Sequence, residues 1–238
     1  MKREELRENL NRLYALYGFR LEQQTENILV YSYHVGYFHN AEIVLLEDNE
    51  ASRKRAEEIE EEYKEIEYNS IVKVVYQSIQ ATHDKLFDAF FSIKESQRRL
   101  QMEYEGFCRK KSEKLLDDYI YIPCSYRNSK GEECGDLIHN VVKSVGGQAP
   151  RLTILEAAAG YGKTCTAYEI LSVLLKERKE RIPLFIELSK NRTARIFRHV
   201  LYDEMDKKFT QLSYETVLRE VKDGRLPLII DLSLIHIP

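Results

Sequence analysis

A glycine-rich run that ends in lysine and threonine contains the residue types with the clearest chemistry in this sequence. It follows a short apolar segment, residues 152–155, and reads Glu-Ala-Ala-Ala-Gly-Tyr-Gly-Lys-Thr over residues 156–164. The Walker A phosphate loop requires Gly, four residues of any type, then Gly, Lys and Ser or Thr. Ala157 stands where the first glycine is expected, and the last three positions match. The pattern therefore predicts a phosphate-binding loop with one departure.

The chemistry of triphosphate binding explains these residue types. A strand must turn sharply into a helix so that backbone N–H groups point at the phosphates. Gly160 and Gly162 permit the φ values of such a turn, whereas Ala157 fits only if its own φ is negative. We expect Lys163 to reach the β- and γ-phosphates and the Thr164 hydroxyl to ligate Mg²⁺. The alternative is a turn that binds nothing. The predicted cofactor-binding residues are Ala157, Gly160, Tyr161, Gly162, Lys163, Thr164 and Cys165.

A second element of the same chemistry is an apolar segment that ends in an acid, Leu226–Asp231. A Walker B element has this form, since its carboxylate must lie beside the phosphate loop to hold Mg²⁺. The pattern is weak alone, and its place downstream of a phosphate loop strengthens it. We expect Asp231 to be the catalytic acid and to bind the metal together with Thr164.

Composition limits the classes of function. The chain has 238 residues, of which 43% are hydrophobic and 32% charged, as in an ordinary globular protein of one large or two small domains. A net charge of −3 gives no global attraction to nucleic acid or to an anionic membrane. No apolar run approaches the roughly 20 residues of a membrane-spanning helix. The four cysteines lack Cys-x-x-Cys spacing, which favours reduced thiols. We expect a cytoplasmic protein with no membrane partner, and nucleic-acid binding is not indicated, although a local basic patch would permit it.

Residues 1–78 predict a small α/β domain. Apolar side chains recur at helical spacing in two segments, and β-branched or aromatic runs indicate strands, two of which form a hairpin. The predicted elements are a helix over 4–17 ended by Gly18, strands over 19–23, 28–35 and 41–46, a helix from Asn49 or Ser52 to about Ile66, and a strand over 71–76.

Residues 79–118 predict a long helical connector, because they contain almost no Gly or Pro. From Leu86 to Phe107, apolar side chains recur at alternating spacings of four and three. Gln97 is a polar interruption of this stripe, and Gly106 is the expected weak point. The stripe packs either on the chain's own N-terminal domain or on a partner or second copy, and the sequence leaves both open.

Residues 119–238 are expected to form a second α/β domain around the phosphate loop. Strands that alternate with helices predict a parallel sheet. The predicted elements are a strand over 119–123, a polar loop over 124–135, a helix over 137–145, a strand over 152–155, a helix from the phosphate loop to about Arg178, a strand over 183–188, helices over 193–209 and 213–221, and a strand over 226–231.

Residues 150–231 resemble the STAND class of P-loop NTPases, in particular its NACHT-like bacterial members. The likeness is carried by residues 152–164, 183–192, 194–206 and 224–231, about a third of the chain. The resemblance implies that ATP, or alternatively GTP, binds with Mg²⁺. It also implies that nucleotide exchange or hydrolysis switches oligomerisation, often in antiviral defence. The longer parent protein would then be a nucleoside-triphosphate hydrolase and a homo-oligomer.

The sequence departs from those relatives after Asp231. Their Walker B aspartate is usually followed by Gly, one further residue and Asp-Glu, which are absent here. Residues 232–237 read as an in-frame translation of a sequencing-adaptor end, so we expect an artefactual tail over 232–238 on a truncated domain. The next strand of the related fold would lie between the phosphate-loop strand and the Walker B strand. We therefore expect an incomplete sheet with exposed edges, poor solubility and negligible hydrolysis by this chain alone.

Two other functions remain open for the N-terminal domain. Glu42, Asp48 and Lys73 could supply the carboxylates and lysine of a metal-dependent nuclease effector, although their spacing is loose. Alternatively, the domain and its helical stripe form a protein-interaction or oligomerisation module, which we prefer because the stripe exists.

Overall fold

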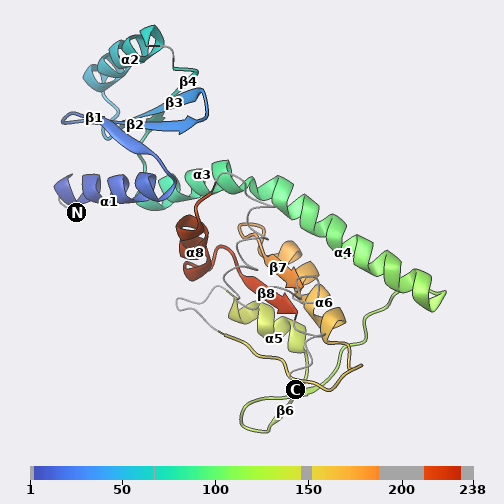
Figure 1. Cartoon of the computed structure of the whole chain (residues 1–238). Helices are drawn as coiled ribbons and strands as arrows, with labels where there is room; N and C mark the ends of the chain where they lie inside the picture. The colour runs from blue at the N-terminus through green and yellow to red at the C-terminus, as the bar shows by residue number, and fades with distance from the viewer. Residues whose placement is uncertain (1–2, 67, 146–151, 188–211, 232–238) are drawn as a thin grey trace. The chain divides into compact units, whose positions relative to one another are not determined.

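The computed structural model describes residues 3–66, 68–145, 152–187 and 212–231 (Figure 1). Its elements are mixed α/β, which confirms the predicted fold class. The chain divides into two compact units, Met1–Phe90 and Phe91–Pro238, and the division falls inside the predicted helical connector. The helix expected over 193–209, the motif residues 188–192 and the tail 232–238 lie outside the described residues.

The first unit contains a four-stranded sheet of order β1-β2-β3-β4. The pairs β1/β2 and β2/β3 are antiparallel, whereas β3 and β4 are parallel and are connected through α2. Every element predicted for this domain forms, with ends shifted by up to three residues. The elements are α1 (Arg3–Leu16), β1 (Arg20–Gln24), β2 (Ile28–Val35), β3 (Phe38–Leu45), α2 (Glu50–Glu65), β4 (Ser70–Val75) and α3 (Ile79–Phe91).

Successive strand residues point to opposite faces of a sheet. Both faces of this sheet carry buried side chains, and a helix packs on each of them. On one face, buried side chains of β2 and β3 pack with Ala56 and Ile59 of α2. On the other face, Tyr14 of α1 stacks on Tyr31 of β2 with ring centroids 3.9 Å apart. Tyr31 is the register partner of Glu42 on β3, so Glu42 belongs to the face that carries α1.

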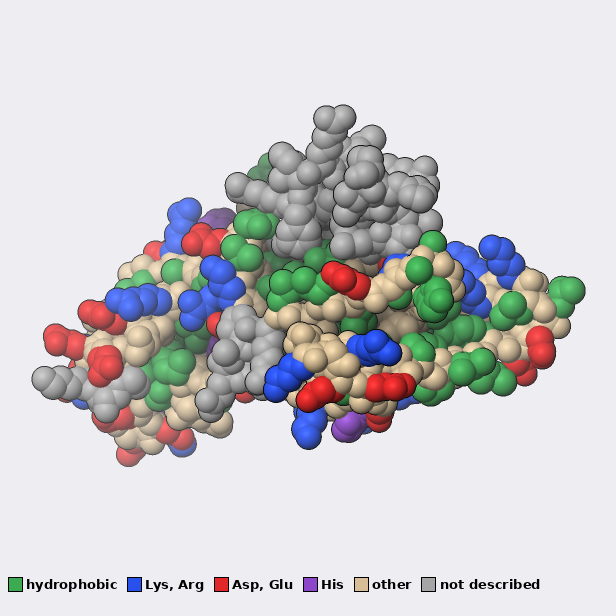
Figure 2. All heavy atoms as spheres, turned by 90° about the horizontal axis from the view of Figure 1, so that it is seen from below, with side chains coloured by type: hydrophobic (Ala, Val, Ile, Leu, Met, Phe, Trp, Pro, Cys, Tyr) green, Lys and Arg blue, Asp and Glu red, His purple; other side chains and the backbone are tan. Residues whose placement is uncertain are grey.

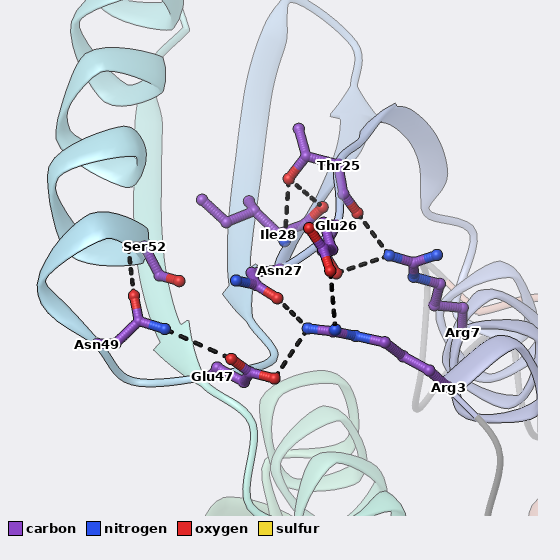
Figure 3. Close-up of polar contacts among 9 residues, drawn as sticks. All are labelled: Arg3, Arg7, Thr25, Glu26, Asn27, Ile28, Glu47, Asn49 and Ser52. Atoms are coloured by element: carbon purple, nitrogen blue, oxygen red, sulfur yellow. Dashed lines mark hydrogen bonds and ion pairs between the residues drawn. The ribbon is translucent and has the colours of Figure 1, made fainter.

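Two arginines of α1 form hydrogen bonds with the turn between β1 and β2 (Figure 3). Arg7 Nη2 donates to the carbonyl oxygens of Thr25, at 2.9 Å, and Glu26, at 2.6 Å. Arg3 bonds to Asn27 and to Glu47 in the loop after β3. Hydrogen bonds from a charged donor are stronger than neutral ones, so these contacts fix one end of α1 against the sheet.

Among its described residues, the second unit contains two small sheets and several helices. The pair β5/β6 is antiparallel, and the pair β7/β8 is parallel, as predicted for strands that alternate with helices. Among the described residues of the whole chain, none of the helices is both long and apolar enough to cross a bilayer. The elements are α4 (Ile93–Leu115), β5 (Tyr126–Arg127), β6 (Glu133–Cys134), α5 (Leu137–Ser144), α6 (Lys163–Glu177), β7 (Leu184–Glu187), α8 (Tyr214–Lys222) and β8 (Leu228–Asp231).

The predicted long helix is interrupted at Ser92, not at Gly106. Ser92 has a φ of 48°, in the left-handed region, and separates α3 from α4, which continues through Gly106. The apolar stripe divides at the same point. Phe90 on α3 packs against Tyr33 in the first unit, whereas Phe107 on α4 stacks on Tyr168 of α6 in the second. The alternative in which the whole stripe packs on the N-terminal domain is therefore wrong for α4.

Two segments predicted as strands are irregular. Residues 119–123 and 152–155 have apolar, strand-like sequences but form no regular element. Several of their apolar side chains are exposed, Ile122 at 81% and Leu152 at 86%, whereas Tyr119 and Tyr121 are partly buried. A strand needs a hydrogen-bonded neighbour, and neither segment pairs with a strand among the described residues.

Buried tyrosines predict a loss of stability at alkaline pH. Burial raises the pKa of Tyr63 to about 12, and burial and the neighbouring Glu42 raise the pKa of Tyr14 far above its ordinary value. In the unfolded chain these phenols ionise near pH 10, so the unfolded state loses protons first. We expect the free energy of unfolding to be constant between about pH 8 and 9.5 and to fall as pH rises through 10 to 12. Urea unfolding between pH 8 and 11.5, with phenolate absorbance at 295 nm, measures this. A free energy of unfolding that is flat across that range would contradict it.

Candidate functional site

The turn that enters α6 has two of the backbone features expected of a phosphate loop, positive φ at its glycines and a helix that begins at Lys163, but no strand precedes it among the described residues. Gly160 and Gly162 have φ values of 86° and 75°, and Gly162 is the N-cap of α6, which begins at Lys163. An added Cβ would meet no atom within 4 Å at either glycine, so backbone conformation and not crowding requires glycine here. Ala157 does not have a positive φ, which confirms the condition under which alanine is tolerated at the first position.

Lys163 folds back over this turn. Its Nζ donates to the carbonyl oxygens of Ala157, at 2.7 Å, and Ala158, at 2.9 Å. The ammonium group is therefore bonded to the loop that precedes α6, which begins at Lys163 itself. A positive charge and unpaired helix N–H groups at one point favour a bound anion.

The predicted metal-binding acid ends β8. In the parallel pair β7/β8, Asp231 is the register partner of Glu187, so two carboxylates end neighbouring strands at the same edge (Figure 1). Asp231 is 9% exposed. In open α/β sheets, ligands bind outside the carboxyl ends of the parallel strands, and this edge is therefore the chemically relevant one.

Tyr168 connects α6 to that edge. Its hydroxyl donates to Glu187 Oε1 at 2.7 Å, and its ring packs on Phe185 with centroids 4.4 Å apart. Burial, followed by the hydrogen bond to Glu187, raises the pKa of Tyr168 far above its ordinary value, so the phenol remains a donor. Thr164 lies four residues earlier on α6, on the same helix face and about 6 Å nearer the phosphate loop. The first turns of α6 thus lie at the carboxyl edge of β7 and β8.

Of the other predicted cofactor residues, Tyr161 lies within the loop and Cys165 follows it. The side chain of Tyr161 is 76% exposed, and Cys165 is a partly buried free thiol in the first turn of α6. Sequence reasoning missed Glu187 and Tyr168. A signal for Glu187 was present, because Leu184–Glu187 is an apolar strand that ends in an acid, the same pattern that singled out Asp231.

The structure does not assemble the nuclease set considered for the N-terminal domain. Glu42 accepts hydrogen bonds from Tyr14 of α1 and from Lys85 Nζ of α3, the latter at 2.7 Å. Lys73 lies on the other face of the sheet, where its Nζ pairs with Glu60 of α2 at 2.6 Å.

Asp48, the third member of that set, is bound elsewhere. Its carboxylate accepts two hydrogen bonds from Arg53, at 2.6 and 2.8 Å, which lower the pKa of Asp48. The three side chains therefore have separate partners, and the alternative in which they converge on one metal ion is not supported, because strand alternation sends Glu42 and Lys73 to opposite faces.

Metal and pocket geometry add two observations. The described residues contain no group of three or more His, Cys, Asp or Glu side chains that could hold a metal ion. A nucleotide-bound Mg²⁺ does not need such a group, since it takes one or two protein oxygens besides phosphates and water. A pocket of about 290 Å³ lies between residues 121–124, the start of α5 and α6, and it does not include the phosphate loop.

Comparison with known proteins adds a family for the N-terminal half. Residues 9–129 match the family model described as NACHT-associated inactive Restriction Endonuclease 2, NA-iREase2, which covers just over half of the chain. The chain belongs to the NA-iREase2 family. No curated protein and no solved structure matches it.

The NA-iREase2 match extends from α1 to the end of β5. It supports a restriction-endonuclease-like N-terminal domain, which was an alternative from sequence, and the family description calls this domain inactive. The NACHT association in that description agrees with the resemblance of residues 150–231 to NACHT-like proteins. The match ends before the phosphate loop, and no P-loop NTPase family was matched. Nucleotide binding therefore stays a prediction.

Proposed function

We propose that this NA-iREase2 chain joins a nuclease-like domain that does not cleave to a nucleotide-binding switch module of a NACHT-type defence protein. The observation that carries the proposal is the position of the Lys163 ammonium. It is held within the glycine turn by the carbonyls of Ala157 and Ala158, where α6 begins. An incoming triphosphate would replace these two carbonyls as the partner of the ammonium and would accept from the N–H groups of the turn.

The donor groups at this site fit Mg²⁺. The Thr164 hydroxyl and the Asp231 carboxylate are oxygen donors, which Mg²⁺ prefers, and both belong to elements at the carboxyl edge of the β7/β8 pair. Bound Mg²⁺ would neutralise charge on the β- and γ-phosphates. Thr164 would orient the metal from the start of α6, and Asp231 would hold it from the sheet.

Titration of the purified chain with a fluorescent ATP analogue tests the proposal. We expect saturable binding that weakens at least about tenfold when EDTA removes Mg²⁺, and competition by ATP that is stronger than competition by GTP. Asp231→Asn should reduce the Mg²⁺ dependence while leaving the metal-free affinity unchanged. The absence of saturable binding to the folded chain would refute the nucleotide switch.

The N-terminal domain is proposed to act by binding a partner. Each residue considered for cleavage already has a partner of opposite charge. Glu42 is paired with Lys85, Asp48 with Arg53, and Lys73 with Glu60. Basic and acidic side chains are interspersed on the face that Figure 2 shows, which does not favour a nucleic-acid surface there. A second copy, brought in by the nucleotide switch, is the partner that the NACHT-like resemblance implies. DNA cleavage by the purified chain with Mn²⁺ would contradict this part.

A further inference from the structure

The two strands of the β7/β8 pair end in the same way. Leu184–Glu187 and Leu228–Asp231 each consist of three apolar residues followed by an acid, and the two acids are register partners. Neighbouring parallel strands lie about 4.8 Å apart, and register partners point to the same side of the sheet. The carboxylates of Glu187 and Asp231 are therefore immediate neighbours.

Both carboxylates lie on the face that α6 covers. Tyr168 of α6 contacts Glu187 and also Phe185, which shares its face of β7. On β8, Ile229 shares the face of Asp231 and packs with buried residues of α6 and α5. The acid pair thus faces the first half of α6, at the level of Tyr168.

This level lies one helical turn behind the expected metal position. Thr164 and Tyr168 are four residues apart, so they share a face of α6 with a separation of about 6 Å along its axis. Mg²⁺ bound to a nucleotide keeps several water molecules in its octahedral shell. Water on such an ion would be the donor to carboxylates at this depth, because each carboxylate oxygen can accept hydrogen bonds.

Two adjacent carboxylates repel each other unless a cation or hydrogen-bond donors compensate them. Tyr168 supplies one such donor to Glu187, and its ring is held between Phe107 of α4 and Phe185 of β7, with centroids 3.9 and 4.4 Å away. The phenol therefore has a fixed position from which it orients Glu187.

We infer that Glu187 is a second carboxylate of the nucleotide site, which accepts hydrogen bonds from water on the Mg²⁺ beside Asp231, and that Tyr168 is the positioning residue that orients it. This inference rests on the proposed nucleotide function. In the NACHT-like relatives, the further acids follow the Walker B aspartate, and this Asp-Glu pair is missing after Asp231. The inference gives the role of a second acid to Glu187 at the end of β7 instead.

The experiment measures how much Mg²⁺ the full chain needs to bind a fluorescent ATP analogue. For Glu187→Gln we expect the Mg²⁺ concentration at half-saturation to rise about fivefold to tenfold, because one acceptor of metal-bound water has lost its charge. Affinity in EDTA should stay equal or increase, because a negative charge near the phosphates is gone. Glu187→Asp keeps the charge and should lie between the wild type and Glu187→Gln. Tyr168→Phe should shift the half-saturation in the same direction by about twofold to threefold.

Glu169→Gln is the matched control. Glu169 is the next residue of α6 and also accepts from a tyrosine, Tyr104, at 2.9 Å, but it is not at the strand ends. It should leave the Mg²⁺ dependence unchanged. If Glu187→Gln kept the Mg²⁺ dependence of the wild type while Asp231→Asn changed it, the role of Glu187 would be overturned. The nucleotide function would still stand. Absence of nucleotide binding in the folded wild type would overturn both, and circular dichroism verifies the fold of each variant.

Discussion

Lys163→Ala is expected to weaken Mg²⁺-dependent nucleotide binding at least about a hundredfold, or by about 3 kcal/mol. The lysine ammonium lies within the glycine turn, bonded to two loop carbonyls. Without it, the triphosphate would meet those carbonyl oxygens with no positive charge between them. Titration with a fluorescent ATP analogue measures the loss.

Lys176→Ala is the matched control for this prediction. Lys176 is an exposed lysine in the last turn of the same helix, so its removal changes the net charge by the same amount. It should leave nucleotide affinity within about twofold, because exposed charges more than a Debye length of about 8 Å away are screened. Equal affinity of Lys163→Ala and the wild type would remove the phosphate-loop interpretation.

Lys85→Met is expected to destabilise the first unit by about 2 kcal/mol. Lys85 compensates Glu42, whose side chain is only 10% exposed, whereas that of Lys85 is 39% exposed. Methionine keeps most of the apolar stem and removes the charge, so the carboxylate of Glu42 would retain Tyr14 as its donor but lose its cation. Breaking a fully buried pair costs about 3–5 kcal/mol, and the partial exposure of Lys85 reduces that value. Urea unfolding of the full chain measures the difference.

The control for Lys85→Met lies on the opposite face of the same sheet. Lys73 also pairs with a glutamate, but Glu60 is 21% exposed and has a second lysine, Lys64, at 2.9 Å. Lys73→Met should therefore cost less than about 1 kcal/mol. Adding Glu42→Gln to Lys85→Met should recover part of the loss, because the uncompensated charge disappears. Equal effects of the two lysine variants would show that Glu42 does not depend on Lys85.

The NA-iREase2 domain shows why its nuclease-like character was hard to infer from sequence. A nuclease is recognised by acids that converge on a metal ion, and here the considered acids have separate partners. The sequence separation of Glu42 and Lys85 is 43 residues, so no local pattern joins them. Without a converging set, the sequence could offer the nuclease only as one alternative for this domain.

The sequence by itself determined the features that depend on near neighbours. The bounds of β2, Ile28–Val35, and the turn between Gly160 and Lys163 were predicted, and Asn49 was one of the two predicted caps of α2, because strand alternation, capping and positive φ are properties of a few consecutive residues.

Only the tertiary structure decided the features that depend on distant partners. It left residues 152–155 irregular, broke the connector at Ser92 and made Glu187 the neighbour of Asp231. A strand exists only if another strand supplies its hydrogen bonds, and a side chain at a strand end acquires its chemistry from whatever packing places beside it. Those partners lie tens of residues away, beyond the reach of any local pattern.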